Sequence, residues 1–166
     1  MNAKIKITNK RRISGEEIGD ITFSSSKLKG INLTKNIVSD MIDEIPIFAI
    51  LAALSKGKSS FSGGSELKNK ESDRIHSLYL GLKACGINIK KKKDGLIINS
   101  KIKEEIDNKP VNIKTFYDHR LSMAFLIMGL AYKKKIIVDN IDCIKTSFPN
   151  FFDVMKKIGA RFQKKS

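Results

Sequence analysis

A repeat of charged positions ahead of apolar helices is the feature that most constrains how this chain folds. Asp43 and Asp118 each precede an apolar helical segment, and they are 118 − 43 = 75 residues apart. Lys70 and Lys145 each precede the next helical segment, and 145 − 70 gives the same spacing. This period is longer than those of solenoid arrays. It predicts about two copies of a β/α unit packed around a shared core, in a chain that begins inside one copy.

Hydrophobic periodicity predicts the helices and strands of this unit. Helices are expected at residues 42–54, 71–84, 120–131 and 151–158. Strands are expected at residues 4–8, 19–24, 29–33, 59–62, 87–91, 96–99, 111–115 and 136–139, with a polar loop or short helix over 101–110. Gly86 and Gly159 would end two of the helices. The order of these elements predicts a mixed fold of the α/β (α+β) class.

Length and composition favour one folded, water-soluble domain. The chain has 166 residues, of which 41% are hydrophobic, so it can bury a core and is not of the disordered class. The apolar run from Ile45 to Leu54 is too short to span a bilayer, and Met1 is not followed by an apolar leader, so we expect a cytoplasmic protein without a membrane partner. Cys85 and Cys143 lie far apart and favour two reduced thiols over a zinc site.

The net charge of +15 raises the question of a nucleic-acid partner. Most of the excess is lysine, in a chain that is also rich in isoleucine and asparagine, so much of it belongs to solvated faces. The chain has no tryptophan and no stacking motif of the RRM type. Small anionic substrates suit a positive field equally well. We therefore expect no nucleic-acid partner, and a basic nucleic-acid-binding module remains the alternative from another class.

Four charged segments stand at the entrances of apolar helices: Asp43-Glu44-Ile45-Pro46, Lys70 to Arg74, Asp118-His119-Arg120 and Lys145-Thr146. Helix N-termini carry free N–H groups and a partial positive charge, so several converging ends would form an anion site. Arginine adds a fork that binds carboxylate or phosphate at two points. If the second helix includes residues 70–74, Lys70 and Arg74 share one of its faces, with Glu71 beside them.

Each of these residues also has an ordinary structural explanation. Asp43 could cap a helix, and Glu71 could stabilise a helix dipole. His119 could be a buried histidine with satisfied hydrogen bonds, and Arg120 could pair with Asp118 alone. These explanations account for the residues singly, but they do not explain why charged clusters recur at the same register of the repeat.

The motifs IDEIP, ELKNKESDRI, YDHRLSMA and IKTSFPNFF, in this order, resemble the 5-enolpyruvylshikimate-3-phosphate synthase family (3-phosphoshikimate 1-carboxyvinyltransferase). The segment GEEIGDITFSSSKLKGI is also similar to that family. The resemblance covers nearly the whole chain and matches the C-terminal part of the enzyme, less than half of a family member. It implies that residues 1–166 form a partial C-terminal lobe of repeated βαβαββ units around parallel helices. The N-terminal lobe would be absent, and the active site would lie between the two lobes.

The resemblance also implies a reaction and a set of residues. The family transfers the enolpyruvyl group of phosphoenolpyruvate to the 5-hydroxyl of shikimate 3-phosphate, in the shikimate pathway to chorismate and aromatic amino acids, and works as a monomer. No metal or organic cofactor is implied. The implied catalytic residues are Asp43 as proton acceptor and Glu71 for proton transfer at the methylene; Asp43 and Lys70 would bind shikimate 3-phosphate, Arg74, Arg120 and Lys145 would bind phosphoenolpyruvate, and Asp118 and His119 would support them.

Some features depart from the family pattern. The Lys-Ser segment, the Gly-rich loop and other ligands of the family's N-terminal lobe are not found in these residues, so we expect this chain alone to be nearly inactive unless an N-terminal lobe joins it in cis or trans. Glu66 stands where some members have an asparagine that touches the substrate, and it is left out of the predicted site. The related UDP-aminosugar enolpyruvyl transferases are a further alternative, although KESDR and DHR together favour the shikimate enzyme.

Overall fold

The computed structural model describes residues 1–102 and 109–163, and most of the loop predicted at 101–110 lies outside the described residues. The helices are α1 (Lys35–Asp40), α2 (Ile45–Leu54), α3 (Arg74–Ala84), α4 (His119–Ala131) and α5 (Phe151–Lys157). The strands are β1 (Lys4–Ile13), β2 (Glu16–Ser24), β3 (Lys58–Phe61), β4 (Ile87–Lys92), β5 (Gly95–Ile102), β6 (Val111–Ile113) and β7 (Ile136–Val138). Short 3₁₀ turns occupy Ile42–Glu44, Ser65–Asn69 and Ile141–Thr146. The mixed α/β class is confirmed.

The first repeat unit is built on a three-stranded antiparallel sheet with the order β3-β5-β4. Strands β4 and β5 form the predicted hairpin, in which Ile89 pairs with Ile98. Alternate residues of this hairpin are buried, as expected for a sheet with one covered face. Helix α3 packs on β4 and α2 packs on β5, so the two helices cover the apolar face.

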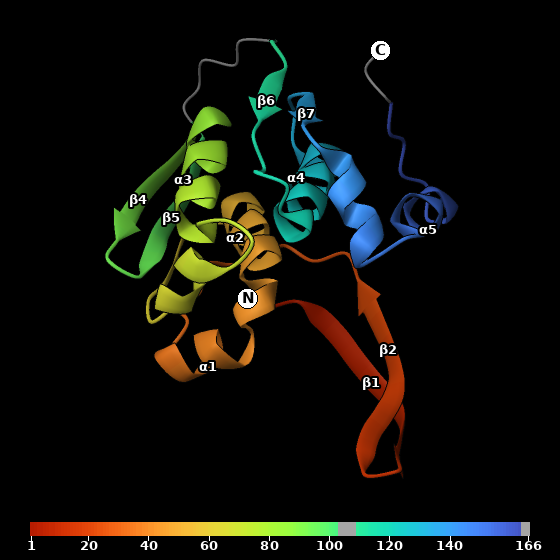
Figure 1. Ribbon diagram of the computed structural model, residues 1–166. Helices are drawn as coiled ribbons and strands as arrows, with labels where there is room; N and C mark the ends of the chain where they lie inside the picture. The colour runs from red at the N-terminus through yellow and green to blue at the C-terminus, as the bar shows by residue number, and fades with distance from the viewer. Residues whose placement is uncertain (103–108, 164–166) are drawn as a thin grey trace.

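The second unit repeats the strand–helix–strand order with β6, α4 and β7. Strands β6 and β7 pair in parallel, with Asn112 opposite Ile137, and α4 packs against β7. The first unit has a reduced version of the same arrangement, because isolated parallel bridges join Lys29 to Lys56 and Asn32 to Ser60 on either side of α2. Figure 1 shows α2 and α4 side by side at the centre, where they pack against each other. The shared core of the two units therefore lies between equivalent helices.

A long hairpin of β1 and β2 projects away from this body (Figure 1). Its strands pair Ile5 with Phe23 and Ile7 with Ile21, so the four side chains share one face. Each of the four is at least half exposed. The hairpin therefore presents an apolar face that no described residue covers.

Several sequence predictions differ from the structure. Residues 29–33 form only isolated bridges and no strand, and helix α1 was not predicted because its short segment has little apolar periodicity. The helix predicted from residue 71 begins at Arg74, because the Asp73 carboxylate accepts a hydrogen bond from the His76 N–H at 2.9 Å and caps the helix there. Lys70 therefore lies outside α3, and the prediction that it shares a helix face with Arg74 is wrong.

Candidate functional site

Three helix entrances meet at one side chain, the guanidinium of Arg74. Arg74 is the first residue of α3, Asp43 lies in the 3₁₀ turn before α2, and Asp118 caps α4. Arg74 Nη1 donates to Asp43 Oδ1 at 2.9 Å, and Arg74 Nε donates to Asp118 Oδ2 at 2.9 Å. The two repeat-equivalent aspartates therefore hold one arginine between them, and the predicted convergence of charged helix entrances is present.

Arg74 is enclosed by carboxylates. Its Nη2 donates to Glu71 Oε2 at 2.6 Å, and its side chain is 1% exposed. Burial alone would lower the pKa of Arg74, but the hydrogen bond and charge of Asp118, with help from Asp43 and Glu71, raise it. The guanidinium is thus a permanent buried cation. It can contact a ligand only if one of the exposed carboxylates, Asp43 or Glu71, moves aside.

The structure shows the contacts of Asp118, for which the sequence indicated only a supporting role. Its carboxylate is fully buried, and Oδ1 accepts hydrogen bonds from the N–H groups of Arg120 and Leu121 at the start of α4. The Ser72 hydroxyl donates to Oδ2, which also binds Arg74. Asp118 therefore joins the cap of one helix to the first residue of another.

Asp43 lies on the solvent side of this cluster and gathers three cations. Besides Arg74, its carboxylate lies 3.3 Å from Arg120 Nη2 and 3.7 Å from Lys70 Nζ. Burial alone would raise the pKa of Asp43, but the hydrogen bond from Arg74 and the charges of Arg120 and Lys70 lower it below its ordinary value. Asp43 does not cap α2, and Arg120 pairs with Asp43 rather than with Asp118, so both ordinary structural explanations are wrong.

Lys70 forms an ion pair with Glu66, a residue that was left out of the predicted site. Lys70 Nζ lies 2.7 Å from Glu66 Oε1, four residues earlier in the chain. The hydrogen bond to Glu66 raises the pKa of Lys70, in spite of partial desolvation. The spacing of four residues was the available signal in the sequence. Glu66 therefore competes with any anion that approaches Lys70.

The structure also places the two remaining predicted residues, His119 and Lys145. His119 Nδ1 lies 3.8 Å from Glu71 Oε1, and the imidazole is largely buried at the edge of the cluster. Lys145 instead pairs with Asp142 at 3.2 Å on an exposed 3₁₀ turn. Within the described residues no hydrogen bond or ion pair joins Lys145 to the cluster. The structure therefore unites all the predicted site residues except Lys145.

A hollow of about 190 Å³ opens beside the cluster, between the start of α2 and the first turns of α4 up to Ile127. Asp43 and Arg120 lie at its charged end, and apolar side chains such as Ile47, Met123 and Ile127 form the rest of its lining. A carboxylate and a guanidinium at the mouth of an apolar hollow can orient a small anion.

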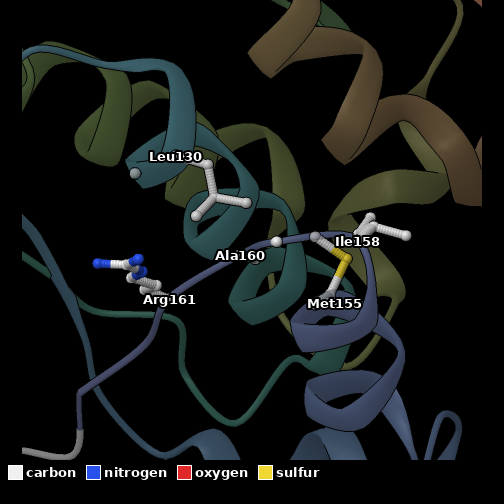
Figure 2. A pocket seen from close by; sticks show the side chains of 7 residues that line it. Leu130, Met155, Ile158, Ala160 and Arg161 are labelled. Atoms are coloured by element: carbon white, nitrogen blue, oxygen red, sulfur yellow. The ribbon is translucent and has the colours of Figure 1, made fainter.

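A second hollow, of about 440 Å³, lies at the other end of α4. Figure 2 shows Leu130 on one side of it and Met155 and Ile158 on the other, with Arg161 at its edge. Of the predicted site residues, none lines this hollow. We therefore place the candidate site at the helix entrances and not in this hollow.

The chain is similar to proteins of one known family. The family model described as EPSP synthase (3-phosphoshikimate 1-carboxyvinyltransferase) matches residues 1–155. The chain belongs to the EPSP synthase family. The resemblance found in the four motifs is thereby confirmed.

Relatives and solved structures of EPSP synthases extend along nearly the whole chain. The 3-phosphoshikimate 1-carboxyvinyltransferases of Zymomonas mobilis and Campylobacter hominis are 41% and 44% identical over 98% of this chain, which spans 36% of each relative. An EPSP synthase structure from Acinetobacter baumannii superposes with a TM-score of 0.87 at 33% identity, over 100% of this chain and 38% of that one. The enolpyruvyl transferase NikO from Streptomyces tendae shares the fold at a TM-score of 0.61 and 16% identity, over 95% of this chain and 33% of that one.

The described part of the chain lacks two further features. Among residues 1–102 and 109–163, no helix is long and apolar enough to cross a membrane. In the same residues, no group of three or more histidine, cysteine, aspartate or glutamate side chains is placed to hold a metal ion.

Proposed function

We propose that this chain supplies part of the active site of a 3-phosphoshikimate 1-carboxyvinyltransferase. The reaction is the transfer of the enolpyruvyl group of phosphoenolpyruvate to the 5-hydroxyl of shikimate 3-phosphate, with release of phosphate. The observation that carries the proposal is the convergence of Lys70, Arg74 and Arg120 on the ionised Asp43, in a member of the EPSP synthase family.

The chemistry requires two groups that exchange protons. The hydroxyl oxygen of shikimate 3-phosphate bonds to C2 of phosphoenolpyruvate and loses its proton, while C3 gains one. The C2–O bond to phosphate then breaks, and C3 loses a proton to restore the double bond. Asp43 is the proposed acceptor for the hydroxyl proton, and Glu71, which lies between Arg74 and His119, is the proposed group at C3. Asp43 is ionised at neutral pH and can accept a proton, and its lowered pKa makes it a weaker base until a substrate displaces some of the surrounding cations.

Different cations of the cluster would bind the two anionic substrates. Arg120 is partly exposed at the charged end of the small hollow, so it is the first candidate for phosphoenolpyruvate, whose phosphate and carboxylate both suit an arginine fork. Arg74 would join it once Glu71 turns away, and Lys145 would approach from its own 3₁₀ turn. Lys70 would release Glu66 to bind shikimate 3-phosphate.

A further part of the family fold, in cis or in trans, would complete the cleft. The chain spans about a third of the length of its curated relatives. Its uncovered apolar surface supports such a partner: besides the β1–β2 hairpin, two matching rows of partly exposed side chains run along α2 and α4. These rows are Ile47, Leu51 and Leu54, and Met123, Ile127 and Leu130. Both substrates are small charged molecules that do not cross a bilayer unaided, so the compartment that we propose is the cytoplasm, and the assembled unit would act as one monomeric enzyme.

Phosphate release tests this proposal. The full chain is assayed alone and after co-expression with the remaining N-terminal portion of the Zymomonas mobilis enzyme, with each substrate omitted in turn. We expect release only from the co-expressed assembly and only with both substrates. Arg120→Ala should lower the rate at least ~100-fold by removing a charged contact to substrate, whereas Arg161→Ala, at the remote hollow, should not. An assembly that folds and binds neither substrate, or that is insensitive to Arg120→Ala, would rule the proposal out.

A further inference from the structure

The turn that leads into α4 has an unusual backbone. Phe116 and Tyr117 are consecutive residues with φ angles of 55° and 59°, in the left-handed region. The Asp118 N–H donates to the Thr115 carbonyl oxygen at 3.0 Å and closes the turn. Glycine and asparagine usually occupy two successive positions of this kind, because a larger side chain meets the backbone there. Phe116 is 46% exposed and Tyr117 is 71% exposed, so neither side chain is buried in the core and burial does not hold the turn in place.

An anchor holds the near end of this turn. Thr115 is fully buried, and both its N–H and its hydroxyl donate to Asp139 Oδ1 at 2.8 Å. Asp139 directly follows β7, and its own N–H donates to the Ile113 carbonyl oxygen at the end of β6. Ser122, fully buried in α4, places its hydroxyl 2.9 Å from Thr115 Oγ1. The parallel strand pair therefore fixes Thr115 through a single carboxylate.

The far end of the turn is Asp118, whose carboxylate binds Arg74 and caps α4. The Ser122 hydroxyl also lies 2.9 Å from the Asp118 carbonyl oxygen, so one hydroxyl touches both ends of the turn. Strained backbone of this kind persists only where the surroundings determine it, and it is concentrated at functional sites. Here the residue that follows the strained pair is the one that orients the central guanidinium.

We propose that Thr115 and Asp139 are positioning residues of the charged cluster, which act through the strained Phe116–Tyr117 turn and Asp118 on Arg74. This inference rests on the proposed function: positioning the cluster affects catalysis only if the cluster binds the substrates and takes part in the reaction. The anchor keeps two residues in a conformation that they would otherwise leave. Without it, the turn relaxes, Asp118 shifts, and Arg74 no longer aligns with Asp43.

Titration of Asp43 by carboxyl NMR in the full chain reads out this geometry without any substrate, so it succeeds or fails independently of the proposed reaction. Thr115→Val removes the hydroxyl and keeps the shape of the side chain, and we expect it to raise the pKa of Asp43 toward its ordinary value. Thr115→Ser keeps the hydroxyl and should preserve the low pKa. As a control, Ile98→Ala in the buried face of β5 should reduce stability without changing the Asp43 titration.

A variant that relieves the backbone strain at Phe116 and Tyr117 gives the decisive test. Phe116→Asn with Tyr117→Gly gives a pair that adopts positive φ readily, so adding it to Thr115→Val should restore the low pKa of Asp43. Should Thr115→Val prevent folding, Asp139→Ala, which removes the oxygen that both Thr115 donors share, takes its place. The proposal is overturned if Thr115→Val behaves as Ile98→Ala does, losing stability with an unchanged titration. It is equally overturned if the asparagine–glycine pair fails to restore the titration.

Discussion

Asp118 and Arg74 form an ion pair that is almost completely removed from solvent. Asp118 Oδ2 lies 2.9 Å from Arg74 Nε, and the two side chains are 0% and 1% exposed. A buried pair of this kind contributes little when it is compared with apolar packing, but it is costly to break, because the remaining charge has no water around it. The pair therefore fixes the relative positions of α3 and α4 at the candidate site.

Replacing Asp118 with asparagine should be strongly destabilising. Asp118→Asn leaves Arg74 as a buried cation with one carboxylate fewer, and we expect it to lower the free energy of unfolding by about 3–5 kcal/mol. Urea unfolding of the chain measures the change. Asp142→Asn is the matched control, since Asp142 pairs with Lys145 on the surface, and it should change stability by less than about 0.5 kcal/mol. Equal effects of the two substitutions would contradict the importance of burial.

The lowered pKa of Asp43 predicts how stability depends on pH. A carboxyl with a lower pKa in the folded state than in the unfolded state stabilises the fold above its unfolded pKa, and this contribution is lost as the pH falls through the folded value. The ordinary value is 3.8, so the loss should occur below that pH. Asp43→Asn removes the titrating group, and the wild-type chain should therefore lose its stability advantage over this variant in strong acid.

Urea midpoints of the wild-type chain and Asp43→Asn, measured from neutral pH down to strong acid, test this dependence. The difference between the two should be constant in the neutral range and should shrink below pH 3.8. Since Asp43 is partly exposed, added salt should also reduce the difference. A gap that widened as the pH fell would mean that burial, and not the three cations, dominates the titration of Asp43.

The sequence predicted which residues gather at the site better than it predicted their partners. A charged residue ahead of an apolar segment is a local signal, and the repeat added that such entrances are equivalent, so Asp43, Arg74 and Asp118 could be found. The choice of Arg74 as the shared partner depends on how α2, α3 and α4 pack, which no local pattern contains. For the same reason the sequence alone could not exclude that Arg120 simply pairs with Asp118, close to it in sequence, whereas the structure pairs it with Asp43.

The elements with strong local periodicity could be predicted from the sequence, and features that depend on contacts between distant residues could not. The β4–β5 hairpin and helix α4 have strong periodicity, and both were located within a few residues of their observed bounds. The start of α3 was wrong because Asp73, in the middle of a charged run, is the residue whose side chain reaches the His76 N–H. The proposed role of Thr115 could not be found, because its partner Asp139 follows a different strand, β7, and nothing in the sequence pairs the two residues.

Glu66 should weaken the hold of the site on anions. Its carboxylate is hydrogen-bonded to Lys70 and raises the pKa of that lysine. Glu66→Gln removes the charge and keeps the shape, so the pKa of Lys70 should fall and its ammonium, left with the longer contact to Asp43, should bind phosphate more readily. NMR titration of the Lys70 Nζ group checks the first effect, and Asp142→Asn should leave Lys70 unchanged. If Lys70 titrates identically with and without Glu66, the pair contributes nothing in solution.

Gly81 should be irreplaceable for a packing reason, although it lies inside helix α3. A Cβ atom at Gly81 would collide with the buried ring of Phe125 in α4, whereas one at Gly129 would meet only Ile136 Cβ, at an ordinary 3.5 Å. Alanine in a helix interior is favoured over glycine by about 1 kcal/mol, but overpacking a core costs about 1–3 kcal/mol. Thermal and urea unfolding should therefore show that Gly81→Ala destabilises the chain and that Gly129→Ala stabilises it. If both substitutions raised stability alike, α3 and α4 could not cross as closely as the structure has them.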